Sequence, residues 1–151
     1  MQKKPTDELD ALLKDMKPDQ LDQYYKENRP YLADDKKEFY YYMREILDKR
    51  SYKLKDIYSF AGVSESYGGQ IMRMEKHTAD RDLILRFCIA GHFSWDETNR
   101  ALKLYGFSEL YSKDPRDACI IVAINNRIFD LGEIDKRLSG HGLKTITPEE
   151  Q

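Results

Sequence analysis

Residues that begin an α-helix recur along this chain, and signals for β-strands are almost absent. Ser94 and Glu97 stand in the spacing of a capping box, in which a hydroxyl and a carboxylate satisfy free backbone N–H groups reciprocally. Asp114 is an expected N-cap and precedes Pro115, which the first helical position tolerates. Apolar residues follow these starts at the period of about 3.6 that an α-helix produces. The sequence therefore predicts an all-α protein.

The N-terminal part predicts two short helices and a link. Thr6 is the expected N-cap of the first helix, and Pro18 stands where the first turn of the second helix tolerates it. The apolar stripe of the first helix consists of Leu9, Leu12, Leu13 and Met16. The polar segment 28–37 contains Pro30 and predicts the link to the next unit.

The central part has the strongest helical periodicity. We expect a core helix at 37–50, a short helix that ends at a left-handed Gly62, a helix capped by Ser64, a fourth helix within 77–93 and a fifth that begins after Ser94. Leu54, Ile57 and Tyr58 are expected to point inward. The apolar and aromatic residues that the other predicted helices contain are Phe39, Met43, Ile46, Leu47, Tyr67, Ile71, Met74, Leu83, Ile84, Phe87 and Ile89.

The C-terminal part predicts two more helices. The run "ACIIVAI" is apolar on every face, so the helix at 115–126 should be the most buried one or lie in a dimer interface. Leu131, Ile134 and Leu138 share one side of a helix that ends at Gly140. The residues after 143 predict a frayed tail.

The composition indicates one soluble intracellular domain with extensions. Hydrophobic residues make up 40% and charged residues 34% of the 151 residues, without an apolar run of the roughly 20 residues that a membrane span needs. The N-terminus lacks the apolar segment of a signal peptide, so we expect a cytoplasmic protein. Cys88 and Cys119 have apolar neighbours and predict two buried thiols, with no disulfide, metal site or cofactor.

Motifs that carry catalysis are missing. The sequence contains no phosphate-binding loop, no Cys-x-x-Cys, no His-Glu-x-x-His and no Gly-x-Ser-x-Gly. His77, His92 and His141 lie far apart, each beside a turn, where a solvated side chain is the ordinary outcome. We therefore expect no catalytic residues and no enzyme.

Charge differs between three expected segments, namely an N-terminal extension at 1–35, a central domain at 36–107 and a C-terminal extension at 108–151. The central segment has 13 basic and 10 acidic side chains, a net charge of +3, whereas the flanking segments are acidic. This asymmetry is compatible with an anionic partner for the central segment, although it is weak for a nucleic-acid-binding surface.

The run from Tyr42 to Ala101 resembles the DNA-binding domain of the lambda-repressor-like helix-turn-helix family, also called the XRE family. The residues that match the turn and the recognition helix of that family are Ala61, Gly62, Val63, Ser64, Ser66, Tyr67, Gln70, Ile71 and Glu75. The whole chain is also similar to a group of firmicute helix-turn-helix proteins, some of them encoded beside protein kinases. The resemblance implies a five-helix core, extended here by helices on both sides, and a role in regulation or signalling.

The resemblance implies that the helix after Ser64 enters the major groove of duplex DNA with its N-terminal end first. Helix N-termini favour anions, so the Ser64 hydroxyl is suited to a phosphate. The expected DNA-binding residues are Ser64, Glu65, Ser66, Gly69, Gln70, Arg73 and Lys76. Gln70 is suited to reading a base edge, whereas Arg73 and Lys76 are suited to phosphates.

Several residues depart from the family pattern. Leu54 stands where many relatives have a glutamine that binds a backbone phosphate, and Glu65 brings a negative charge to the groove. Gly68 and Gly69 each cost about 1 kcal/mol relative to alanine inside a helix. Gly68 is expected on the packed side, where it lets two helices approach, and Gly69 on the outer side, where a phosphate backbone or a partner helix can come near.

The tyrosines of "FYYYM", with Tyr24, Tyr25 and Tyr31, admit two interpretations. They can form a stacking platform for single-stranded nucleic acid, or they can be half-buried tyrosines that pack the N-terminal extension. The second interpretation is the more common one for such residues.

The leading functional hypothesis is sequence-specific binding of double-stranded DNA by a transcriptional regulator, as a homodimer through the C-terminal helices. The alternative is a degenerate helix-turn-helix fold that binds a protein partner in signalling or phage defence. Glu65, Leu54 and the two glycines favour the alternative, and the intact turn and cap favour DNA.

Overall fold

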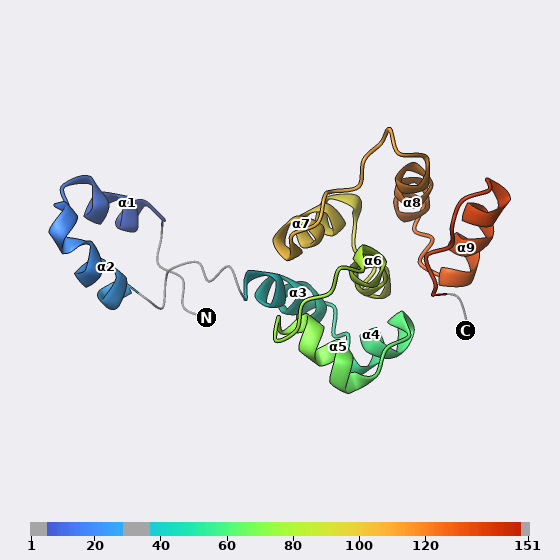
Figure 1. The fold of residues 1–151 in the computed structure, drawn as a ribbon, viewed down its shortest axis with the longest axis horizontal. Coiled ribbons are helices and arrows are strands. Elements are labelled where there is room, and N and C mark those ends of the chain that lie inside the picture. The colour runs from blue at the N-terminus through green and yellow to red at the C-terminus, as the bar shows by residue number, and fades with distance from the viewer. Residues whose placement is uncertain (1–5, 29–36, 149–151) are drawn as a thin grey trace. The chain divides into compact units, whose positions relative to one another are not determined.

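The computed structural model describes residues 6–28 and 37–148 (Figure 1). The predicted link at 29–36, Tyr31 and the capping role of the Thr6 side chain lie outside the described residues. The chain divides into two compact units, residues 1–34 and 35–151. The larger unit takes in both the predicted central domain and the predicted C-terminal extension, and the boundary between these two stays a prediction.

All regular structure in the described ranges is helical, so the predicted all-α class is confirmed. The first unit contains α1 (Thr6–Lys14), a short 3₁₀ helix (Pro18–Gln20) and α2 (Leu21–Asn28). The second unit contains α3 (Glu38–Lys49), α4 (Leu54–Ala61), α5 (Glu65–Met72), α6 (Arg81–Ala90), α7 (Trp95–Tyr105), α8 (Pro115–Asn125) and α9 (Leu131–Gly140).

The first unit leaves much of its apolar surface in solvent. Leu12, Leu13, Leu21 and Tyr25 are exposed, whereas Tyr24 is buried. The Asn28 side-chain amide donates a hydrogen bond to the Tyr24 carbonyl at 3.1 Å, which closes the last turn of α2. The predicted stripe on α1 is therefore largely exposed within this unit.

Helix α6 is the centre of the second unit. Every residue of 83–89 is buried, and α4 and α7 pack against this helix (Figure 1). More of α6 is buried than of α8, where Val122 has an exposed fraction of 58%. The prediction that α8 is the most buried helix is wrong because α8 lies beside α9 at the edge of the unit. Its other alternative, a dimer interface, stays a prediction.

The predicted caps at Ser94 and Asp114 are confirmed. The Ser94 hydroxyl accepts the Glu97 backbone N–H at 3.1 Å, and the Glu97 carboxylate accepts the Ser94 N–H at 2.9 Å. Asp114 caps α8 by accepting the backbone N–H groups of Arg116 and Asp117. These local hydrogen bonds fix where α7 and α8 begin.

Two reciprocal ion pairs tie α8 to α6. Arg81 donates to both carboxylate oxygens of Asp117 at 3.0 and 3.1 Å, and Arg116 donates to both oxygens of Asp82 at 2.8 Å. Each helix thus supplies one arginine and one aspartate at its N-terminal end. The two pairs set the position of α8 against the core.

Residues 144–147 are held in place, which corrects the predicted frayed tail for this part of it, while residues 149–151 lie outside the described ranges. Ile146 has an exposed fraction of 1%, and its backbone N–H donates to Asp135 of α9 at 2.7 Å. Arg116 donates to the carbonyls of Lys144 and Thr145, each at 2.9 Å. These residues are ordered by arginine donors and one aspartate acceptor from other parts of the chain, which the composition of the segment does not reveal.

A buried arginine joins this tail to the middle of the unit. Arg86 on α6 has an exposed fraction of 3% and donates to the carbonyls of Ala61 and Ile146, each at 2.9 Å. Burial lowers the pKa of the Arg86 guanidinium, while Asp80 at 4.0 Å acts in the opposite direction. Arg86 therefore bridges the end of α4 and the C-terminal segment.

None of the helices in the described ranges has the length and apolarity that crossing a membrane requires.

Candidate nucleic-acid interface

Helices α4 and α5 are joined by the short turn that the sequence predicts. Gly62 follows α4 with a φ of 80°, a left-handed conformation that side chains disfavour. Ser64 then caps α5, and its hydroxyl accepts the Tyr67 backbone N–H at 3.1 Å. The two helices contact each other and α4 packs on α6. The N-terminal end of α5 is thereby fixed to the core.

Gly68 lies on the packed side of α5, as predicted. A Cβ added at this position would lie 2.6 Å from Cδ1 and 2.7 Å from Cγ of Tyr58 on α4. The Tyr58 ring thus occupies the space that a side chain would need. The absence of a side chain at Gly68 permits the close approach of α4 and α5.

Gly69 is buried, which corrects its expected outward position. The guanidinium of Arg73 covers it, because an added Cβ would lie 2.7 Å from Nη1 of Arg73. Arg73 is held there by Glu75, whose carboxylate accepts from Nε at 2.8 Å. A partner reaches the Gly69 backbone only after this pair moves.

The first turn of α5 is the exposed part of the predicted site. Ser64, Glu65 and Ser66 are exposed, and Gln70 is half-buried one turn further on. Tyr67, which the sequence placed in this helix, has an exposed fraction of 38%. It lies beside these residues on the first turn, where its ring is only partly covered.

The basic residues of the predicted site behave differently from one another. Hydrogen bonding to Glu75 raises the pKa of Arg73, and the same contact lowers the pKa of Glu75. Lys76 is exposed and forms no ion pair within the described part of the chain. Arg73 therefore meets a carboxylate of its own chain, whereas Lys76 is available to a phosphate.

The sequence analysis did not identify two lysines at the start of α4. Lys53 is the N-cap residue of this helix and Lys55 lies in its first turn, and both are exposed. Neither forms an ion pair with a described carboxylate. The segment "YKLKD" contained the signal, because lysines flanking the leucine at the helix start suit phosphates even where the leucine does not.

The three histidines are exposed, and two of them stack on aromatic rings. His77 stacks on Tyr105 with ring centroids 4.8 Å apart, and His92 stacks on Phe129 at 4.5 Å. Burial, Arg127 and Arg50 lower the pKa of His92. Among the described residues no three His, Cys, Asp or Glu side chains are grouped so that they could hold a metal ion.

No protein-family model matches the chain, and no curated protein or solved structure is significantly similar to it.

Proposed function

We propose that the unit 35–151 binds double-stranded DNA sequence-specifically as a non-enzymatic, cytoplasmic transcriptional regulator. The observation that carries this proposal is the capped and exposed first turn of α5. It presents the exposed residues Ser64, Ser66 and Tyr67, which carry hydroxyl groups, on a helix end that follows the turn at Gly62. A rigid, polar helix N-terminus of this kind is suited to the major groove.

The side chains of this turn supply the chemistry of base reading. Ser66 and Tyr67 can both donate and accept hydrogen bonds, and Glu65 can accept from the amino group of a cytosine. Gln70 is suited to a bidentate contact with an adenine. Together these side chains discriminate base edges without an arginine.

Lysines on both sides of the turn supply the contacts to phosphates. Lys53 and Lys55 lie at the start of α4, and Lys76 follows α5. Arg73 can join them by leaving Glu75, because a solvent-exposed ion pair of this kind adds little to stability. With three to four phosphate contacts, binding should depend strongly on salt.

A protein partner is the second candidate, and the charge of the α5 surface favours it. Glu65 is exposed, and the pairing of Arg73 with Glu75 removes one positive charge from the surface. The resulting field is weaker than that of most DNA-binding surfaces. In this alternative the same turn contacts a signalling or phage-defence protein.

A selection of bound sequences from random duplexes with the full chain tests the proposal. We expect a short palindrome, which would also support a homodimer through the C-terminal helices. Gln70→Ala should lose about 1 to 3 kcal/mol on the selected site only. Lys76→Gln should weaken binding to every sequence and reduce the salt slope by about one unit.

The matched control for the lysine variant is Lys113→Gln, which removes an exposed lysine from the segment before α8. It should leave both affinity and salt slope unchanged. If folded protein enriches no motif at low salt, the DNA hypothesis is wrong and the protein partner takes its place.

A further inference from the structure

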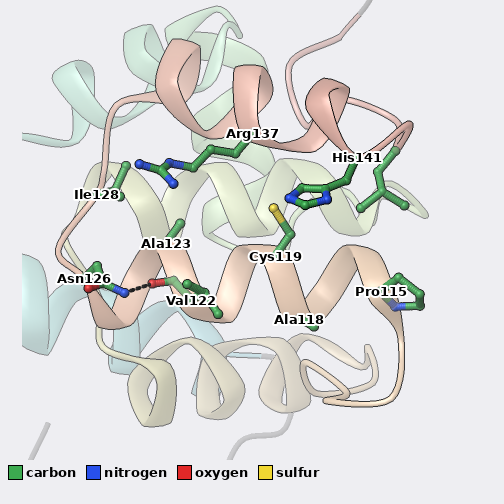
Figure 2. A pocket seen from close by; sticks show the side chains of 10 residues that line it. Pro115, Ala118, Cys119, Val122, Ala123, Asn126, Ile128, Arg137 and His141 are labelled. Carbon is green, nitrogen blue, oxygen red and sulfur yellow. Dashed lines mark hydrogen bonds between the residues drawn. The ribbon is translucent and has the colours of Figure 1, made fainter.

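A groove of about 650 Å³ lies between α8 and α9 (Figure 2). None of its lining residues belongs to the segment 53–76 proposed to bind DNA. Pro115, Ala118, Cys119 and Val122 line the groove from α8. Arg137 approaches from α9, and His141 approaches from the residue that follows this helix (Figure 2). A volume of this size is typical of sites for small molecules. Its position makes it independent of the surface proposed for DNA.

The walls of the groove are apolar and its polar groups are cationic or neutral. The remaining lining residues are Ala123, Asn126, Ile128 and Leu143. No carboxylate is among the described residues that line it. The groove therefore matches a ligand with an apolar body and a negative end, since an unpaired cationic end would find no counter-charge there.

Arg137 is available to such a ligand. Its partner is Glu133, one turn earlier on α9, at 3.2 Å. Both side chains are about half exposed, so this pair contributes little and a ligand carboxylate can replace it. A planar guanidinium binds a carboxylate through two parallel hydrogen bonds, which gives the site a preferred ligand orientation.

We propose that this groove binds a free small molecule with an apolar body and one carboxylate. The apolar body lies along Ala118, Val122 and Leu143, and the carboxylate meets Arg137. The proposal concerns a site on α8 and α9 and does not rest on DNA binding.

Cys119 provides the readout because it lines the groove, whereas Cys88 is fully buried and burial raises the pKa of its thiol. In the folded chain, alkylation by N-ethylmaleimide should thus occur at Cys119, as mass spectrometry can follow. We choose octanoate as the probe and octanamide as its neutral isostere. At 5 mM, octanoate should slow alkylation at least fivefold and octanamide less than twofold.

Arg137→Gln should reduce the effect of octanoate to that of octanamide. Lys136→Gln, which removes the neighbouring cation of α9 that does not line the groove, should leave the protection unchanged. A titration of amide NMR signals with octanoate should shift residues of α8 and α9 in the original chain.

Three results would overturn the proposal. Octanoate and octanamide protect Cys119 equally, or protection by octanoate persists in Arg137→Gln, or octanoate at 10 mM shifts no amide signal of α8 and α9. The NMR arm decides the case in which Cys119 reacts too slowly for alkylation to be followed. None of these results bears on the α5 surface, so the two proposals fail separately.

Discussion

The two adjacent glycines of α5 meet neighbours of different kinds. Gly68 faces Cβ, Cγ and Cδ1 of Tyr58, and these atoms cannot move without disturbing the contact between α4 and α5. Gly69 faces the far end of the Arg73 side chain, which can swing into solvent. The same substitution should therefore have opposite effects at the two positions.

Gly68→Ala should lower the free energy of unfolding by about 1 to 2 kcal/mol, because the strain of overpacking exceeds the gain in helix propensity. Gly69→Ala should raise it by up to about 1 kcal/mol through helix propensity alone. Urea unfolding of both variants measures this difference. Equal effects of the two substitutions would contradict the assigned packing.

Glu97 gives the stability a dependence on acid pH. Desolvation raises the pKa of its carboxyl, but hydrogen bonds from Ser94 and Arg50 and the charge of Arg50 outweigh desolvation and hold the pKa below the ordinary 4.5. As pH falls below this ordinary value, the unfolded chain takes up the proton first, so stability is lost.

Glu97→Gln should flatten the loss of stability between pH 5 and about pH 3, as measured by urea midpoints. Glu45→Gln removes a carboxylate from an exposed pair with Lys49 and serves as the control, with a profile close to that of the unchanged chain. A steep acid profile that persists in Glu97→Gln would assign the effect to other carboxylates.

At the scale of the elements, local sequence signals predicted where the helices begin. They did not predict which side chains contact one another at the candidate site. Ser64, Ser94 and Asp114 act on N–H groups within three residues, so sequence alone reveals them. The predicted helix at 37–50 agrees with α3 to within one residue at both ends. The predicted helix at 115–126 agrees equally well with α8.

The contact of Arg73 with Glu75 could not be predicted from periodicity. Helix α5 ends at Met72, and Met74 has a φ of 61°, which turns the chain and brings Glu75 back to Arg73. The sequence instead predicted a helix that contains Met74. The left-handed conformation of Met74 therefore places the Glu75 carboxylate beside Arg73, where it offsets the positive charge near the candidate interface.

At the scale of the whole unit, distant parts of the sequence depend on Arg86. Its guanidinium satisfies a carbonyl at the end of α4 and another after α9. Neither acceptor is close to Arg86 in sequence, which explains why the segment after residue 143 looked unstructured from its composition. The end of α4 and the C-terminal segment share one buried donor.

Arg86→Met should lower the free energy of unfolding by about 2 to 4 kcal/mol, because the buried carbonyls of Ala61 and Ile146 lose their hydrogen-bond donor. Arg100→Met, at an exposed position on α7, should change it by less than about 0.5 kcal/mol. Denaturant unfolding of both variants is the measurement. A loss below about 1 kcal/mol in Arg86→Met would indicate that water replaces the guanidinium.

The span between Arg86 and its last acceptor also matters while the chain is being synthesised. Ile146 lies 60 residues after Arg86, which at about 5 to 20 residues per second corresponds to roughly 3 to 12 seconds of translation. During that interval the nascent chain already contains Arg86 and the Ala61 carbonyl. The second acceptor of Arg86, the carbonyl of Ile146, has not yet been synthesised. The ribosome-bound chain should therefore present α6 to solvent or to chaperones until the segment after α9 arrives to complete it.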